Sequence, residues 1–174
     1  MPLVSGRLPT APRVPLSLAA FRNQAPKYDS LSGEGARIHG GRFNPPGSFP
    51  VLYLCETRPC VVAEFERQAT KNVVGVDGLL PRVLYRYELQ LDRVLDLTDV
   101  AVREHIGVSI DDLVREDWET CQAIGTDAHD LGDQAVRSFS ATGVDVVLAV
   151  FPESLGAGLI SVDLDERWDT AADL

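Results

Sequence analysis

The sequence is poor in the residues on which several common kinds of site depend. It has only three cysteines in 174 residues and no Cys-x-x-Cys or Cys/His cluster, which excludes zinc-finger and iron–sulfur sites and predicts no metal. Cys55 and Cys60 lie among apolar residues, so we interpret them as small buried side chains. No apolar run approaches the ~20 residues of a membrane span, and the first residues lack a signal-peptide pattern. We therefore expect a cytoplasmic protein without a membrane partner.

Positive charge is also scarce. The sequence has 16 Lys and Arg residues and 26 Asp and Glu residues, which gives a net charge of −10. Sequence-independent binding to nucleic acid or to an anionic membrane needs a basic face, so this balance argues against both. The sequence has no G-x-x-x-x-G-K-[ST], no G-x-G-x-x-G between a strand and a helix, and no G-x-S-x-G. His39, His105 and His129 are far apart, and we interpret them as surface or capping residues.

What is present is typical of one folded domain, with 45% hydrophobic and 24% charged residues. Alternation and apolar runs predict strands, and capping residues with apolar spacing predict helices. The expected strands are residues 16–22, 51–54, 82–91, 136–140, 144–151 and 159–164, and the expected helices are residues 57–69, 98–106 and 118–134. These elements do not alternate regularly, which favours an α+β domain with a mixed β core and flanking helices.

Two segments lack this patterning. Residues 1–15 are rich in proline and are predicted to form a loosely ordered N-terminal arm, ahead of a domain over residues 16–174. Residues 23–50 are predicted to be a long loop, and loops of this length in small domains are often functional. In that loop Gly40 and Gly41 allow the backbone to approach a ligand closely, and Arg42 places a guanidinium at the same point. This grouping suits a phosphate or pyrophosphate, although a simple turn would have the same residues.

The stretch GEGARIHGGRFNPPGSFPVLYLCETRPCVVAEFER, residues 33–67, resembles the RES domain family, and the resemblance covers about residues 17 to 164. The family pattern has an aromatic residue followed by Arg, then GGR(W/F)N, a Tyr in a short strand, a Glu in the next helix, and a Ser-Ala pair before an apolar strand. The matching residues are Phe21-Arg22, Gly40 to Asn44, Tyr53, Glu64 and Ser140-Ala141. Phe139 stands where the family often has proline, so Ser138 is a competing candidate for the serine.

The resemblance implies a fold similar to the ADP-ribosyltransferase fold and a toxin that degrades NAD⁺. The reaction would break the nicotinamide–ribose bond, with water or inorganic phosphate as acceptor and no further cofactor. The implied partner is an antitoxin with a Xre-like DNA-binding region, and the oligomeric state stays open.

The resemblance also assigns roles to residues. Arg42 and Arg22 would hold the pyrophosphate beside Gly41, and Tyr53 would stack on the nicotinamide. Glu64 would stabilise the ribose cation, and Ser140 would bind the ribose. Helical spacing alone leaves Glu64 and Glu66 equivalent at the flanks of the apolar stripe, and only the family spacing selects Glu64.

Two other functions remain open at this point. One is an ADP-ribosyltransferase that modifies a macromolecule, although residues 60–63 offer no second polar residue of the kind that such enzymes often carry before the glutamate. The other is a non-catalytic module that binds a nucleotide and a partner protein.

Overall fold

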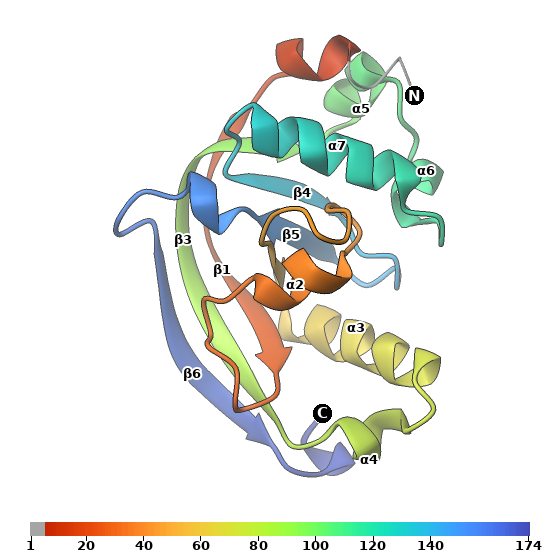
Figure 1. The fold of residues 1–174 in the computed structure, drawn as a ribbon, viewed down its shortest axis with the longest axis vertical. Coiled ribbons are helices and arrows are strands. Elements are labelled where there is room, and N and C mark those ends of the chain that lie inside the picture. Colours follow the sequence, from red (N-terminus) through yellow and green to blue (C-terminus); the bar gives the residue numbers. More distant parts are fainter. Residues whose placement is uncertain (1–5) are drawn as a thin grey trace.

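In a computed structural model that describes residues 6–174, the strands form one mixed sheet that closes on itself (Figure 1). The strands are β1 (Val14–Gln24), β2 (Leu52–Cys55), β3 (Arg82–Asp96), β4 (Ala135–Phe139), β5 (Val146–Val150) and β6 (Ile160–Trp168). Their order is β1-β2-β5-β4-β3-β6, and β1 also pairs with β3. The first five strands of this order therefore form a ring, and β6 is attached outside it on β3.

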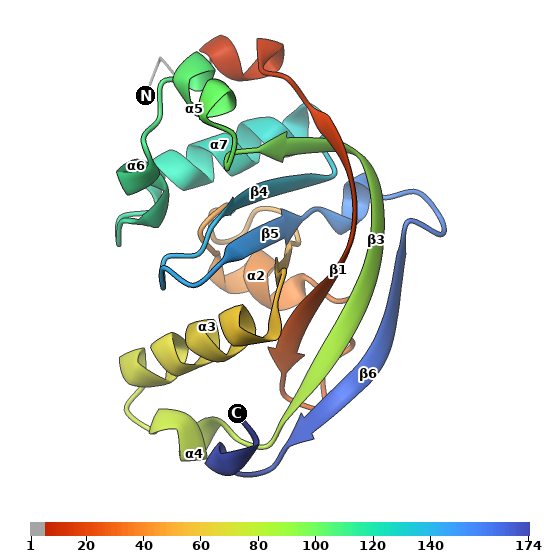
Figure 2. The same cartoon turned by 180° about the vertical axis from the view of Figure 1, so that it is seen from behind.

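Helices cover the two ends of this β core. They are α2 (Glu34–His39), α3 (Arg58–Lys71), α4 (Gly75–Leu79), α5 (Val100–Ile106), α6 (Ile110–Val114) and α7 (Glu119–Asp130), with short 3₁₀ turns at Leu8–Thr10, Pro152–Ser154 and Ala171–Asp173. Helices α5, α6 and α7 lie at one end and α3 and α4 at the other, while β1, β3 and β6 arch along one side (Figures 1 and 2). The prediction of one α+β domain with a mixed β core and flanking helices is confirmed. None of the helices within residues 6–174 has the length and apolarity that a bilayer crossing requires.

The apolar run of residues 144–151 lies where its composition predicts. It forms β5, which is hydrogen-bonded on one side to β2 and on the other to β4. Leu148, Ala149 and Val150 are fully buried, and successive side chains of a strand point to opposite faces, so β5 is covered on both faces and tolerates few polar residues there. The alternating segment 82–91 is longer than expected, because it continues without a break to Asp96 and pairs with β1 over most of its length.

Helix α3 carries residues toward the candidate site, and its start is the predicted one. The Thr57 side chain accepts a hydrogen bond from the Cys60 N–H, and Pro59 follows in the first turn, where a missing N–H costs nothing. Cys60, Val61 and Phe65 are buried on its inner face. The predicted burial of Cys55 and Cys60 is also confirmed, and the third cysteine, Cys121, is free and buried as well. The helix expected from residue 98 begins later, because Asp99 and not Thr98 is the N-cap, whose side chain accepts from the Ala101 N–H.

The N-terminal segment differs from the expected loose arm. Residues 1–5 of that arm lie outside the described residues. Leu8 is fully buried, and Arg13 forms an ion pair at 2.8 Å with Asp133, whose side chain is also fully buried. Strand β1 then begins at Val14. The partner of Arg13 is 120 residues away in the sequence, so local composition gave no sign of it. The segment expected to be a long loop, residues 23–50, contains α2, and α4 lies before β3 where no helix was expected.

Gly125 allows α7 to lie directly against the segment that carries Arg42. A Cβ atom built on Gly125 would lie 1.8 Å from the carbonyl oxygen of Phe43. No side chain other than hydrogen fits at that distance. Glycine has a low helix propensity, so from the sequence alone Gly125 weakens the helix. The structure shows that it also permits the close approach of α7 to the turn.

Replacing Gly125 by alanine should therefore destabilise the protein, although alanine favours helix. We expect Gly125→Ala to lower the free energy of unfolding by about 1–3 kcal/mol, the usual cost of overpacking. Gly35→Ala is the matched control, because Gly35 is also helical and a Cβ atom added there would have no other atom within 4 Å. Equilibrium denaturation of both variants makes the comparison, and equal stability would contradict the packing described.

Candidate functional site

A cavity of about 870 Å³ opens between the β core, α2, α3 and the start of α7. This volume is typical of a small-ligand site. The residues expected at the site that line it are Arg22, Gly41, Arg42, Tyr53 and Glu64. They come from β1, from the turn after α2, from β2 and from α3, so the fold joins four separate segments at one place. Ser140 does not line the cavity, although its neighbour Ala141 does.

The turn formed by residues 40–44 is held by two reciprocal backbone hydrogen bonds between Gly41 and Asn44. The Tyr53 hydroxyl fixes it from β2, because it accepts from the Phe43 N–H at 2.8 Å and donates to Asn44 Oδ1 at 2.7 Å. A Cβ atom on Gly41 would lie 2.5 Å from the Tyr53 ring. Gly41 is thus required for contact with Tyr53 itself, in addition to any role toward a ligand.

Helices α2 and α7 hold the same turn from other sides. The buried Asn44 amide donates to the Ala36 carbonyl of α2 at 2.7 Å. From α7, the Gln122 amide donates to the carbonyl of Gly41 at 3.0 Å. The turn is therefore held by polar contacts on both sides, which fixes the origin of the Arg42 side chain.

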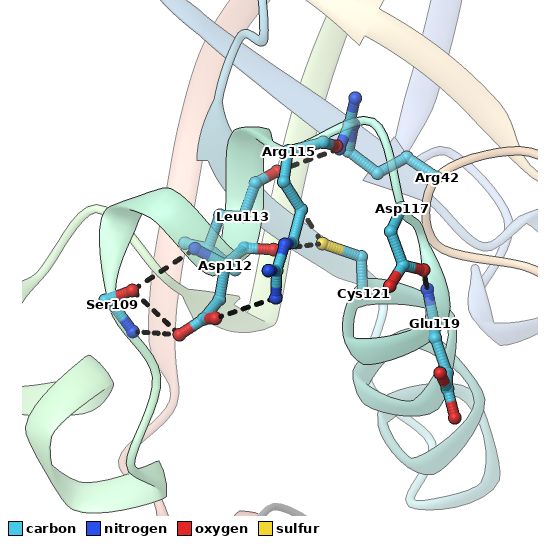
Figure 3. A network of polar contacts seen from close by, with 8 residues as sticks. All are labelled: Arg42, Ser109, Asp112, Leu113, Arg115, Asp117, Glu119 and Cys121. Carbon is cyan, nitrogen blue, oxygen red and sulfur yellow. Dashed lines mark hydrogen bonds and ion pairs between the residues drawn. The ribbon is translucent and has the colours of Figure 1, made fainter.

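Arg42 crosses from the turn to the end of α6 (Figure 3). Its Nη1 donates to the carbonyls of Leu113 and Arg115, at 3.1 and 2.8 Å. The guanidinium also lies over the Trp118 ring, 5.7 Å from its centroid. The buried Nη2 of Arg42 and the buried Nε1 of Trp118 have no hydrogen-bond partner among the described residues. Buried donors are rarely left without an acceptor, so this corner of the cavity suits an anion.

The carbonyls that hold Arg42 are themselves fixed by a capped short helix (Figure 3). Ser109 and Asp112 form a capping box at the start of α6, and this box and a weaker Arg115 contact keep the Asp112 pKa below its usual range. The Cys121 thiol of α7 contacts the Leu113 carbonyl at 3.6 Å, and burial raises the pKa of this thiol to about 11. A thiol that stays protonated is a poor nucleophile, so Cys121 serves packing here.

Glu64 enters the cavity from α3 and is held from behind by the hairpin between β4 and β5. The Ser140 hydroxyl donates to Glu64 Oε1 at 2.7 Å and lies 2.6 Å from the Thr142 hydroxyl. Ser140 is 1% exposed, whereas Glu66, two residues after Glu64, points to solvent and does not line the cavity. The other candidate serine, Ser138, is buried with no hydrogen-bond partner in the described part of the chain. Ser140, and not Ser138, is therefore the serine that hydrogen-bonds to Glu64.

Arginines without an acidic partner gather in the cavity. Five arginines of residues 6–174 form no ion pair with a carboxylate, namely Arg7, Arg22, Arg42, Arg82 and Arg103. Three of these, Arg22, Arg42 and Arg82, line the cavity. Sequence reasoning missed Arg82, because nothing in the alternation of residues 82–91 distinguishes it from other strand arginines. It also missed Trp118, which was seen only as the start of a helix.

Beside the cavity, ion pairs join α3 to the segment that precedes α7. Glu116 precedes α7 and accepts hydrogen bonds at 2.6 Å from Lys71 and from Arg67, which both belong to α3. These bonds lower the pKa of Glu116 to about 2, first through Lys71 and then through Arg67. The carboxylate therefore stays charged at neutral pH, and the ion pairs are lost only as the pH falls toward 2.

Comparison with known proteins identifies the family. The sequence model of the family described as RES domain matches residues 16–170. The chain belongs to the RES domain family. This RES domain is 35% identical over 154 residues to the NAD(+) phosphorylase MbcT of Mycobacterium tuberculosis, a match that covers 85% of the chain and 83% of MbcT. It is also 31% identical over 148 residues to the probable NAD(+) phosphorylase Rv3189 of the same organism, which covers 84% of the chain and 70% of that protein.

A solved structure is similar over nearly the whole RES domain. A chain of the M. tuberculosis MbcT–MbcA toxin–antitoxin complex superposes with a TM-score of 0.84 at 31% identity, covering 97% of this chain and 92% of that one.

As for metals, residues 6–174 of the RES domain contain no group of three or more His, Cys, Asp or Glu side chains placed to hold an ion.

Removing the Tyr53 hydroxyl tests the two hydrogen bonds by which it holds the 40–44 turn, which we call the clamp. Burial raises the pKa of Tyr53, so the hydroxyl stays protonated and can donate to Asn44. Tyr53→Phe leaves the Phe43 N–H and Asn44 Oδ1 without their partner, and we expect a loss of about 1–3 kcal/mol in the free energy of unfolding. Tyr85→Phe is the control, since the half-buried Tyr85 makes no hydroxyl hydrogen bond within residues 6–174. Urea unfolding of the two variants measures the difference, and losses of the same size would argue against the clamp.

Proposed function

We propose that this RES domain breaks the bond between nicotinamide and ribose in NAD⁺, with inorganic phosphate as the acceptor, and acts as the toxin of a toxin–antitoxin pair. Support for the reaction comes from the relatives, which are named NAD(+) phosphorylase and probable NAD(+) phosphorylase. Support for the toxin role comes from the similarity to a chain of a toxin–antitoxin complex. Both similarities extend over most of the chain.

The chemistry of this bond fits the residues of the cavity. Nicotinamide leaves NAD⁺ as a neutral ring, because the electron pair of the broken bond cancels the charge of the pyridinium. The leaving group therefore needs no general acid. The ribose becomes positively charged in the transition state, so a nearby carboxylate lowers the barrier. Glu64 is the lining carboxylate that carries no arginine partner, while Glu34 is paired with Arg37.

The observation that carries the proposal is this pairing of one held carboxylate with unpaired arginines in a single cavity. Glu64 is fixed by Ser140, and Arg22, Arg42 and Arg82 have no acidic partner to neutralise them. A dinucleotide brings the two matching features, an anionic pyrophosphate for guanidinium groups and a ribose that develops positive charge for the carboxylate. Tyr53 and Trp118 line the same space and offer aromatic rings to flat ligand groups. The likeness to the ADP-ribosyltransferase fold stays a prediction.

The partner proposal rests on charge beside the cavity. An open groove next to it shares Trp118 and carries Glu116, Asp117, Glu119 and Asp127. A protein with a basic face would fit this groove and would border the entrance to the cavity. An antitoxin docked there would block NAD⁺, and its Xre-like DNA-binding region remains a prediction from the family resemblance.

Two alternatives make different predictions. A transferase acting on a macromolecule would leave label from NAD⁺ on protein in a lysate, whereas the proposed reaction leaves it on a small product. A non-catalytic module would bind NAD⁺ and release no nicotinamide.

The deciding measurement is nicotinamide release by the purified protein, with and without inorganic phosphate. We expect release that depends on phosphate, and a decrease of roughly 100- to 1,000-fold in kcat for Glu64→Gln, the usual effect of removing a preorganised electrostatic group. Glu66→Gln is the matched control on the same helix, because Glu66 is exposed outside the cavity. Equal rates in both variants would refute the role of Glu64, and no release from the unmodified protein would refute the proposed activity.

The serines provide a second test, of positioning. We expect Ser140→Ala to lower kcat by roughly 10- to 100-fold with little change in the KM for NAD⁺, because about 1.5–3 kcal/mol is typical of a hydrogen bond to a charged group. Ser138→Ala should retain activity, since Ser138 contacts neither Glu64 nor the cavity. A larger effect at position 138 than at position 140 would show that the assignment of the serine is reversed.

A further inference from the structure

Arg82 and Arg22 form a second cationic group in the cavity. Arg82 is the first residue of β3, its Nε donates to Asn23 Oδ1 at 2.8 Å, and its guanidinium lies 5.5 Å from the centroid of the Phe65 ring. Arg22 lies on β1 and donates to the Ser32 carbonyl at 3.1 Å. Both side chains line the cavity, and both lack a carboxylate partner.

The positive charge of Arg82 has no carboxylate near enough to form an ion pair within residues 6–174. Burial lowers the pKa of Arg82, and the positive charge of Arg22 lowers it further. Arg58 offers a comparison, because it also lies over an aromatic ring, 5.6 Å from the centroid of Trp168, but it forms an ion pair with Glu166 at 2.8 Å. An arginine that only packs against an aromatic ring is expected to resemble Arg58. Two guanidiniums that line one cavity, neither with a carboxylate partner, favour a ligand with more than one negative charge.

This group is separate from the Arg42 corner. Arg42 is held by two carbonyls at the end of α6 and by Trp118. Arg22 and Arg82 are held by β1, by α3 and by the loop that follows β1, and the two groups have no partner in common. The cavity therefore offers anions two places to bind. The proposed reaction has two anionic reactants, the dinucleotide with its pyrophosphate and the phosphate that attacks.

We propose that Arg22 and Arg82 bind the attacking inorganic phosphate, while Arg42 and Trp118 bind the pyrophosphate of NAD⁺. This inference rests on the proposed function and divides between two places the role that the family resemblance gives jointly to Arg22 and Arg42. An oxygen of HPO₄²⁻ forms a bond to C1′ of the nicotinamide ribose as the C1′–N bond breaks. The electron pair of that bond passes to the nicotinamide ring, and the phosphate keeps its proton. The products are nicotinamide and ADP-ribose carrying a phosphate on C1 of its terminal ribose.

Such a subsite would also determine the choice of acceptor. A dianion held by two guanidiniums is positioned for attack, whereas a water molecule gains nothing from these side chains. Arg82 is therefore the residue expected to favour phosphate over water. Its loss should affect the phosphate kinetics more than the binding of NAD⁺.

The test compares Arg82→Gln with Arg86→Gln. Arg86 lies four residues further along β3, is exposed, pairs with Glu88 and does not line the cavity. Initial rates of nicotinamide release are measured with phosphate varied at saturating NAD⁺, and then with NAD⁺ varied at saturating phosphate. For Arg82→Gln we expect a rise of roughly 10- to 100-fold in the KM for phosphate, the range for a lost charge-assisted hydrogen bond, and a change below about 2-fold in the KM for NAD⁺. Arg86→Gln should change neither value, and Arg82→Lys should recover part of the phosphate affinity.

Binding of phosphate alone provides a readout that does not depend on turnover. Inorganic phosphate should raise the Tm of the unmodified protein and of Arg86→Gln, and should have a smaller effect on Arg82→Gln and Arg22→Gln. Chloride at the same ionic strength controls for general screening. Circular dichroism of each variant reports whether it is folded, and Arg82→Lys replaces Arg82→Gln if the latter is not.

The outcomes separate this inference from the proposed function. A rise in the KM for NAD⁺ with an unchanged KM for phosphate would place the pyrophosphate at Arg82 and overturn the inference while NAD⁺ cleavage stands. Nicotinamide release at the same rate without phosphate would overturn it as well. If the unmodified protein releases no nicotinamide, the proposed function fails, and the phosphate-dependent Tm still decides whether Arg22 and Arg82 bind this anion.

Discussion

The close packing of the 40–44 turn between β2 and α7 is the constraint on which the candidate site depends. Gly125 brings the helix backbone against the Phe43 carbonyl, and the Tyr53 hydroxyl holds the same turn from the sheet. Neither contact tolerates a displacement, because one is a steric limit and the other a pair of hydrogen bonds. The base of Arg42 is fixed in this way, and its tip is fixed by two carbonyls at the end of α6. A guanidinium held at both ends loses little conformational freedom when it binds an anion.

Charge is distributed so that an acidic protein has a cationic cavity. The net charge is −10, yet Asp133, the one fully buried acidic residue within residues 6–174, is already neutralised by arginine. Asp133 receives both Arg13 and Arg93, and Arg137 is paired with Glu56. The arginines that remain unpaired are concentrated where the cavity opens. Because the Debye length at physiological salt is about 8 Å, the distant acidic surface acts weakly on a ligand inside.

Particular residues show how far the sequence could be interpreted. The Thr57 cap and the apolar run of β5 were recognised because each depends on neighbours within a few positions. The resemblance to the RES family grouped Arg22, Gly41, Arg42, Tyr53, Glu64 and Ser140, and all of these except Ser140 line one cavity. Arg82 was missed because what distinguishes it is the lack of a carboxylate partner in the folded protein, and a sequence does not show which charges are paired. The carbonyl partners of Arg42 went unnoticed because backbone groups have no signature in a sequence. Residues 6–13 were interpreted as loose because the acid that binds Arg13 is remote in the chain.

The sequence by itself determined the family, the α+β class, the main strands and the set of residues from which a site would be built. These follow from local patterns and from motif spacing, which a linear sequence records directly. The family spacing already favoured Glu64 over Glu66, and the tertiary structure shows that Glu64 and not Glu66 lines the cavity. Only the tertiary structure decided between Ser140 and Ser138. The choice of serine depends on one hydrogen bond between α3 and the β4–β5 hairpin, joining residues 76 positions apart. Such a contact arises from the closure of the sheet and the direction of each side chain, and neither is encoded in the order of neighbouring residues.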